Sequence, residues 1–296
     1  MGIFNGYLKE GPGVSKDAPE KHRFFLFFEL FGRKFTKLIQ LNLILFACLL
    51  PMAVGLFNSI MFNPNIITES GLNLQILKSQ PLIHFSGDLS ALIIYIVSLF
   101  IAGPAIAGFT YVIRNFQREE HAWVLSDFKD NFKNNFKQAS ILAIIDSIVY
   151  FILYVAFVFY TYALPAHSTA ITELAPMLTA VIAVITIIYT WMHYYLYVMM
   201  VTFDLSLKDM FKNALLFSIG KLPLNIFITA VCLGIIGLSI YFNIVAGIIA
   251  AACITLSLIG YIIVFSVYPT IDEYLIQPVS VDNDDITSDF SDNTEG

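Results

Sequence analysis

The chain has 296 residues, of which 58% are apolar and 13% charged, and its formal net charge is −6. Soluble globular proteins carry about 25% charged residues. The composition therefore excludes a soluble enzyme, a disordered chain and a nucleic-acid-binding domain, and it indicates an integral membrane protein whose first partner is the lipid bilayer.

Residues 1–37 are predicted to form an N-terminal segment on the cytoplasmic side of the membrane. Six phenylalanines between Phe24 and Phe35 are interleaved with Arg23, Arg33 and Lys34. Aromatic rings beside basic side chains are typical of a helix that lies in the headgroup plane. We therefore expect a Phe-rich interfacial helix ahead of the first membrane span.

Six segments are apolar enough to cross the membrane, which takes about 20 residues per helix. The last two come from one uncharged run that is too long for a single span, and its best turn lies at Tyr241–Asn243. The sequence thus predicts an all-α polytopic membrane protein with six transmembrane helices. These segments are residues 38–62, 89–113, 139–163, 174–203, 222–242 and 244–268.

The basic residues predict the orientation. Of the 16 Lys and Arg residues, all but Lys78 fall in connections on the same side of this six-span arrangement. Because cytoplasmic loops are enriched in Lys and Arg, we expect both termini in the cytoplasm. Residues 272–296 hold eight of the 22 acids and no base, and we expect them to form a disordered acidic cytoplasmic tail.

Prolines interrupt the first two spans. Pro51 is central in the first, and Gly103-Pro104 lies in the second. A proline removes a helical hydrogen bond, and broken helices line the binding sites of many carriers. Pro51, Gly103 and Pro104 are thus candidate helix breaks, although prolines also occur in ordinary membrane helices.

Two cytoplasmic connections predict further interfacial helices, with Ser126 and Ser206 as their caps. Residues 128–134 match residues 207–213 at five of seven positions, which indicates either an internal repeat or convergence of two similar helices. We expect their aromatic and lysine stripes to contact lipid or to dock a partner. The candidate contact residues are Phe128, Lys129, Phe132, Lys133, Phe136, Lys137, Lys208, Phe211 and Lys212.

Asp146 and His193 are ionisable residues inside predicted spans. Such residues are costly in a membrane and often functional. Each lies about 12–15 Å from the cytoplasmic end of its span, at 1.5 Å per residue. One hypothesis is a proton-relay pair or a polar substrate contact. The alternative is structural, with Asp146 bonded to a nearby Tyr, Ser or Asn and His193 in the aromatic cluster 191–195.

Common catalytic motifs are absent from the sequence. It contains no GxxxxGK[ST] phosphate loop, no HExxH and no GxSxG. We therefore expect no enzymatic activity, no cofactor, no metal and no nucleic-acid partner.

Three stretches resemble the YesL-like family, bacterial integral membrane proteins of unknown function. They are residues 11–21 with the Phe-rich segment, residues 103–111 continuing to Phe128, and residues 201–208. The resemblance implies a multi-pass protein of the bacterial cell membrane. It also implies a neighbourhood of ABC-type carbohydrate uptake systems and sugar-responsive regulators, which is association and not mechanism.

Three functions follow as hypotheses. The first is an accessory subunit of ABC-type carbohydrate uptake that contacts a sugar permease. The second is an autonomous small-solute or proton-coupled transporter that uses Asp146 and His193. The third is a membrane partner of a sugar-responsive sensor.

Overall fold

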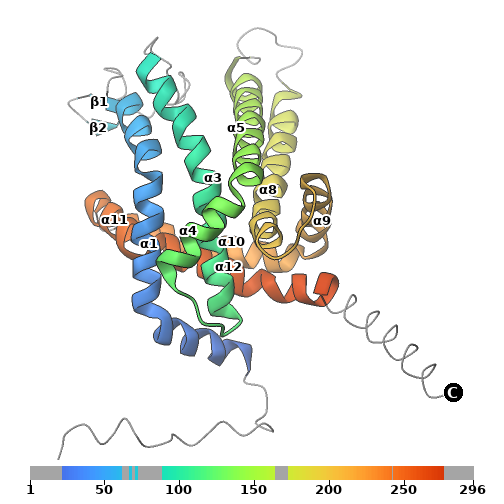
Figure 1. The fold of residues 1–296 in the computed structure, drawn as a ribbon. Helices are drawn as coiled ribbons and strands as arrows, with labels where there is room; N and C mark the ends of the chain where they lie inside the picture. Colours follow the sequence, from blue (N-terminus) through green and yellow to red (C-terminus); the bar gives the residue numbers. More distant parts are fainter. Residues whose placement is uncertain are drawn as a thin grey trace, which may run out of the picture.

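The computed structural model describes residues 22–61, 67–68, 71–72, 89–163, 173–241 and 243–276. The predictions for residues 1–21 and for the acidic stretch 277–296 lie outside these residues. The elements in chain order are α1 (Arg23–Met61), β1 (Ile67–Thr68), β2 (Gly71–Leu72), α3 (Leu89–Gln117), α4 (Val124–Asn134), α5 (Phe136–Val158), η1 (Phe159–Ala163), α8 (Ala175–Met200), α9 (Leu207–Gly220), α10 (Leu222–Tyr241), α11 (Ile244–Ala250), η2 (Ala251–Thr255), α12 (Leu256–Ile271) and η3 (Asp272–Ile276) (Figure 1).

The fold is helical, and in the described part of the chain six helices are long and apolar enough to cross a membrane, as predicted. They are α1, α3, α5, α8, α10 and the continuous helix formed by α11, η2 and α12. Within the described residues, β-structure is limited to the two-residue pair β1 and β2. The π-helical turn η3 extends the last helix to Ile276, so the first five residues of the predicted disordered tail are helical.

The Phe-rich segment and the first span form one continuous helix, α1, rather than two. The first part of α1 runs across one end of the molecule, and the rest turns along the bundle (Figure 1). Phe27 packs on α12, with its ring centroid 4.9 Å from Tyr261 and 5.2 Å from Phe265. Phe24 and Phe25 are exposed, so one face of this segment packs on the protein and the other points away from it.

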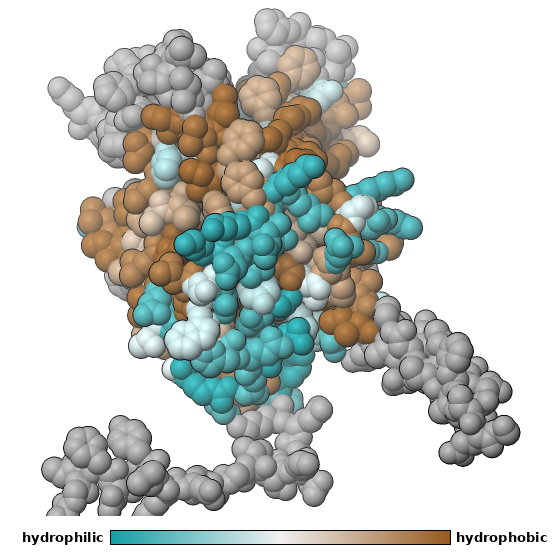
Figure 2. All heavy atoms as spheres, viewed as in Figure 1, coloured by the Kyte–Doolittle hydropathy of each residue, from teal (hydrophilic) through white to brown (hydrophobic). Residues whose placement is uncertain are grey.

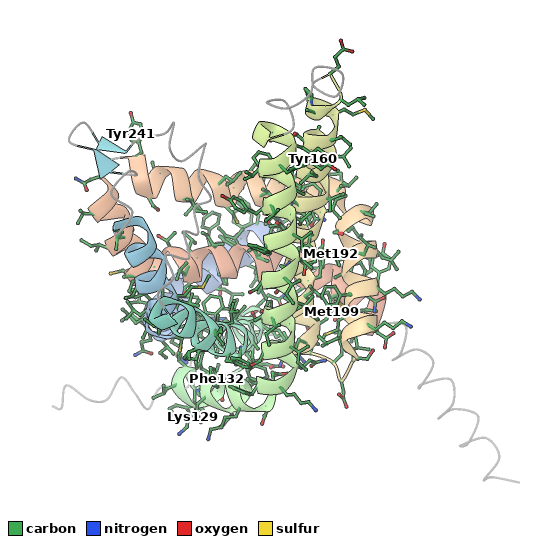
Figure 3. All side chains as sticks on the ribbon, turned by 90° about the horizontal axis from the view of Figure 1, so that it is seen from above. Lys129, Phe132, Tyr160, Met192, Met199 and Tyr241 are labelled. Carbon is green, nitrogen blue, oxygen red and sulfur yellow. The ribbon has the colours of Figure 1, made fainter. Side chains whose placement is uncertain are left out.

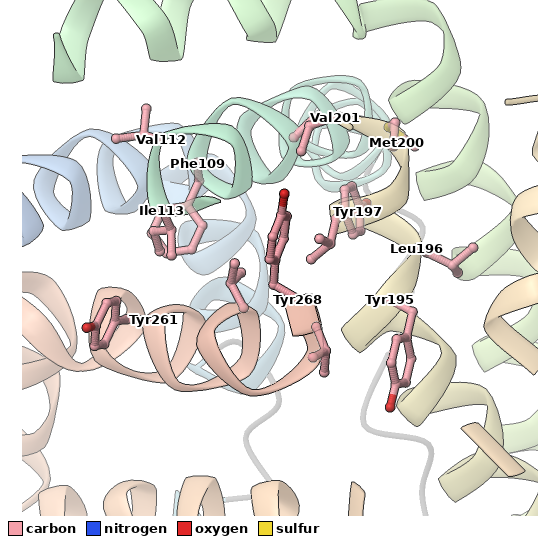
Figure 4. Close-up of a cluster of buried hydrophobic side chains, with 14 of the residues drawn as sticks. Phe109, Val112, Ile113, Tyr195, Leu196, Tyr197, Met200, Val201, Tyr261 and Tyr268 are labelled. Atoms are coloured by element: carbon pink, nitrogen blue, oxygen red, sulfur yellow. The ribbon is translucent and has the colours of Figure 1, made fainter. Parts of the chain in front are cut away.

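Helix α3 occupies the centre of the fold. In its most apolar stretch 61% of the residues are buried, against 28% or less in the other five candidate spans. Its side chains Phe109, Val112 and Ile113 meet α8 and α12 in a buried cluster that includes Tyr197 and Tyr268 (Figure 4). The central helix therefore links the parts of the chain before and after it.

The last two spans do not run alongside the first ones. Both views show α10 and α12 lying across α1 and α3 (Figures 1 and 3). A glycine permits the close crossing, because a Cβ at Gly260 would overlap the Phe109 ring. The crossing of these helices cannot be predicted from the spans in the sequence, because hydropathy indicates the length of a span and not its direction in the bundle.

A buried asparagine joins α1 to the π-helical turn η2. The Asn42 side-chain amide donates to the Ala251 and Ala252 carbonyls at 2.8 and 2.6 Å, and its oxygen accepts from the Ser257 amide at 2.7 Å. A π-turn displaces backbone groups from their helical partners. Asn42 satisfies three of those groups in the apolar interior.

Helices α1 and α3 continue through the candidate breaks Pro51, Gly103 and Pro104, so none of these residues ends its helix. Pro104 deprives the Phe100 carbonyl of its helical donor, and the Ser140 hydroxyl of α5 donates to that oxygen at 3.3 Å. Gly103 lies against the backbone of Ala139, where a Cβ would overlap the carbonyl oxygen. Gly103 and Pro104 thus bring α3 and α5 into close contact.

Gly103→Ala is expected to destabilise the protein by about 1–3 kcal/mol, because the added methyl forces α3 and α5 apart. The control is Gly237→Ala in α10, where a Cβ meets nothing within 4 Å. Thermal unfolding of both variants in detergent micelles measures the difference. Equal midpoints for the two variants would show that the α3–α5 crossing is not tight.

Candidate functional site

The structure brings Asp146 and His193 together. Asp146 lies on α5 and His193 on α8. The Nε2 atom of His193 is 2.9 Å from the Oδ1 atom of Asp146, and both side chains are more than four-fifths buried. Two residues separated by 47 positions thus form an ion-pair contact inside the predicted spans.

Tyr189 connects the two residues. Its hydroxyl donates to Asp146 Oδ1 at 2.6 Å, a length typical of a hydrogen bond to an ionised carboxylate. Its backbone carbonyl accepts a hydrogen bond from His193 Nδ1 at 2.8 Å. Because a carbonyl oxygen only accepts, Nδ1 carries a proton.

The protonation of the pair follows from this geometry. With Nδ1 occupied, a neutral His193 would turn a bare Nε2 lone pair toward the Asp146 carboxylate, and the two would repel. An unneutralised carboxylate in a membrane span is also costly. The contact is therefore favourable when the pair holds one additional proton, on Nε2 or on the carboxyl group.

The Nε2 atom is not aligned for a hydrogen bond with Asp146. It is a buried nitrogen for which the described residues supply no hydrogen-bond partner. A proton on Nε2 is thus held by the field of the carboxylate and not by a closed hydrogen bond.

Aromatic rings surround the pair. Tyr150 lies one helical turn after Asp146, with its ring centroid 5.2 Å from Tyr189 and 6.0 Å from His193. Its hydroxyl pairs with Thr190 at 3.1 Å. Asp146 is thus bonded to a tyrosine, as the structural alternative expects, and it also contacts His193. The proton relay stays a prediction. Tyr189 and Tyr150 are not among the residues predicted from the sequence, although each stands four residues from a predicted site residue.

A pocket of about 850 Å³ opens beside Asp146. It lies between α1, α3 and α5, with Tyr197 contributed by α8. Most of its lining is aliphatic, and its polar side chains are one carboxylate, one serine and three tyrosines. The lining residues are Leu49, Met52, Leu99, Ala102, Gly103, Ile106, Ala143, Ile144, Asp146, Ser147, Ile148, Tyr150, Phe151, Tyr154 and Tyr197.

The two predicted interfacial helices exist as α4 and α9, and their caps differ. Ser206 caps α9, accepting from the Asp209 amide at 3.3 Å. Ser126 does not cap α4, because the helix begins at Val124, where the Asp127 side chain accepts from the Trp123 amide at 2.8 Å. Both helices pack on the spanning helix before them, α4 on α3 and α9 on α8.

The aromatic stripe of α4, expected to contact lipid or a partner, packs largely on the protein itself. Phe128 is buried, and Gly108 of α3 leaves room for it, since a Cβ there would be 2.6 Å from the Phe128 carbonyl oxygen. Phe132 and Phe211 are half-buried against the core. Phe136 belongs to the first turn of α5 and is exposed.

The predicted lysines do point outward. Figure 3 shows Lys129 on the outer side of α4 and Phe132 on the side toward the bundle. Figure 2 shows hydrophilic residues gathered over α4 and over the lower end of the molecule, below a largely hydrophobic upper part. In the described part of the chain, no ion pair involves any of these exposed lysines, which are Lys129, Lys133, Lys137, Lys208 and Lys212.

Comparison with known proteins gives one family. Residues 85–157 match the family described as "Protein of unknown function, DUF624". The matched stretch includes α3, α4 and most of α5, and so it contains Gly103, Pro104 and Asp146 but not His193. No curated protein and no solved structure matches the chain. Among the described residues, no group of His, Cys, Asp and Glu could hold a metal ion.

Proposed function

We propose that this protein is an autonomous membrane carrier that couples the movement of a small solute to that of a proton. The observation that carries the proposal is the Asp146–His193 contact, 2.9 Å long and located beside an apolar pocket in the predicted spans. The pair changes charge by one unit when it gains or loses its proton. The solute in the pocket would sense that change directly.

The geometry supports coupling for an electrostatic reason. Charges interact more strongly in a low-dielectric interior than in water. Whether the pair is neutral or negative therefore decides which solutes the pocket accepts. Conversely, a solute that interacts with Asp146 changes the affinity of the pair for its proton, since such linkage is reciprocal.

Solute-dependent proton movement tests the proposal. Proteoliposomes containing trapped pyranine would be exposed in turn to maltose, glycine and tetraphenylphosphonium. At least one of these probes is expected to change the internal pH with the wild-type protein. Asp146→Asn keeps the side-chain shape and removes the ionisable group, so the rate should fall by about tenfold or more.

The matched control is Asp130→Asn, because Asp130 is exposed on α4 and lies outside the pocket. It should leave the rate unchanged. Two results would contradict the proposal: equal rates for Asp146→Asn and wild type, or no pH change with any of the three probes.

The second candidate is an accessory subunit of ABC-type carbohydrate uptake. Among the described residues, the exposed lysines of α4 and α9 form no ion pair, which favours this candidate because a basic surface suits an acidic partner surface. Phe132 and Phe211 pack inward, so docking would use Lys129, Lys133, Lys208 and Lys212 instead. Crosslinking in native membranes should recover a sugar permease, and substitution of these lysines by glutamine should abolish its recovery.

A further inference from the structure

We infer that the solute is a lipophilic organic monocation, which exchanges with the proton of the Asp146–His193 pair. The inference deepens the proposed carrier function and rests on it. It is drawn from the chemistry of the pocket lining, from the charge of the pair and from the way the pocket borders the exposed surface of α5.

The pocket does not have the composition of a sugar site. A sugar carries a hydroxyl on most of its carbons, and each buried hydroxyl needs a hydrogen-bond partner. The polar lining side chains are Asp146, Ser147 and three tyrosines. Ser147 already donates to the Ala143 carbonyl at 2.9 Å, and the Tyr150 hydroxyl pairs with Thr190. Few polar groups remain for a polyol.

The pocket does have the composition of a site for an apolar cation. Its volume of about 850 Å³ lies in the range of small-molecule sites. Aliphatic side chains from α1 and α3, such as Leu49 and Ile106, form one wall. The opposite wall presents one carboxylate and tyrosine rings, whose faces attract cations. Among the described lining residues there is no Lys, Arg or His to repel such a ligand.

The titratable groups around Asp146 are few. From α8 they are Tyr189, His193 and Tyr197, and from α5 Tyr150 and Tyr154. The described lining residues of α1 and α3 are all apolar. Asp146 and His193 are therefore the acid and the base that set the charge of this region.

Charge balance then couples the cation to the proton. In the empty pocket the Asp146 carboxylate is neutralised by the proton that it shares with His193. When a monocation binds beside the carboxylate, it supplies the same charge, and His193 can release the Nε2 proton to water. The region is neutral before and after the exchange, so the costly bare carboxylate is never formed. About one proton leaves for each cation that enters.

The pocket also borders the outer surface of the bundle. Ile148 and Phe151 line it, and each is 55% exposed. In a membrane these side chains contact lipid, so a ligand that partitions into the bilayer can reach the pocket from the side. This route favours a lipophilic cation over a strongly hydrated one.

Tetraphenylphosphonium binding tests the inference on the purified full-length chain in detergent micelles. Binding is measured by equilibrium dialysis, and proton release by a pH-sensitive dye in weak buffer near pH 7. The wild type should bind the cation and release about one proton per cation bound. Asp146→Asn should bind at least about tenfold more weakly and release none. His193→Gln should still bind the cation, because the Asp146 carboxyl group remains, and the proton that it releases then comes from that carboxyl group.

Two controls separate binding from misfolding and from hydrophobic partitioning. Asp130→Asn should behave as wild type, and all variants should elute as the wild type does in size-exclusion chromatography. Triphenylphosphine oxide, a neutral compound of similar shape, should release no proton. Equal cation affinity in wild type and Asp146→Asn, or binding by the wild type without proton release, would overturn the inference.

The outcomes also distinguish this inference from the carrier proposal. Suppose that maltose or glycine moves protons in proteoliposomes and tetraphenylphosphonium does not bind. The proposed carrier function is then supported, and the inference of a cationic solute is refuted. Suppose instead that the cation binds and releases a proton but no probe moves protons across the bilayer. The inferred cation site is then supported, and the proposed carrier function is refuted.

Discussion

Replacing Asn42 by leucine is expected to destabilise the protein by about 3–5 kcal/mol. Leucine has a similar size but cannot replace the three hydrogen bonds to the Ala251 and Ala252 carbonyls and the Ser257 amide. Asn42 is fully buried, so water cannot take its place. Each polar backbone group that is left unpaired costs about 1–3 kcal/mol.

Thermal unfolding in detergent micelles measures this loss, and hydrogen exchange locates it. The amide of Ser257 should exchange faster in Asn42→Leu than in the wild type, because its acceptor is gone. Asn134→Leu is the control, since Asn134 is exposed at the end of α4, and it should change stability by about 0.5 kcal/mol or less. An unchanged unfolding midpoint in Asn42→Leu would show that η2 does not depend on α1.

Replacing Arg114 by leucine is expected to cost about 3–4 kcal/mol, the second-largest effect. Arg114 is 7% exposed at the end of α3. Its guanidinium donates to the Val201 carbonyl at the end of α8 and to Asn115 Oδ1 at 3.0 Å, and it lies 4.5 Å above the Tyr111 ring. Its loss leaves the Val201 carbonyl and the Asn115 oxygen unpaired in the interior.

Two further variants identify the cause of that loss. Arg114→Lys should recover less than half of the stability, because an ammonium group cannot reproduce the planar fork of donors. Arg118→Leu is the exposed control. Its ion pair with Glu120 is on the surface, at 2.9 Å, and should contribute under about 1 kcal/mol. If Arg114→Leu and Arg118→Leu unfold at the same temperature, Arg114 does not join α3 to α8.

The sequence predicts the spanning helices because their signal is local. An uncharged run of sufficient length is a helix in a membrane whatever it packs against. The proximity of Asp146 and His193 could also be predicted from the sequence. Counting residues from the ends of two neighbouring spans places both side chains at one depth. The four-residue spacing that would have added Tyr189 and Tyr150 is also present in the sequence.

Other features depend on contacts that no local pattern contains. Phe128 faces the protein because Gly108 leaves space for it, and an aromatic stripe does not say whether lipid or protein lies opposite. Pro104 leaves α3 unbroken because Ser140 satisfies the freed carbonyl. Asn42 finds its partners more than 200 residues away. These are interactions between helices, whereas hydropathy describes each helix alone.

¹⁵N NMR of histidine-labelled protein in lipid bilayers shows whether the Asp146 carboxylate holds a proton on His193 Nε2. A His193→Gln sample assigns the His193 signal. We predict that near pH 7 the Nε2 resonance of His193 is that of a protonated nitrogen. In Asp146→Asn it should shift to that of a bare nitrogen in a neutral ring. An identical Nε2 resonance in wild type and Asp146→Asn would contradict the account, because the carboxylate would then hold no proton on His193.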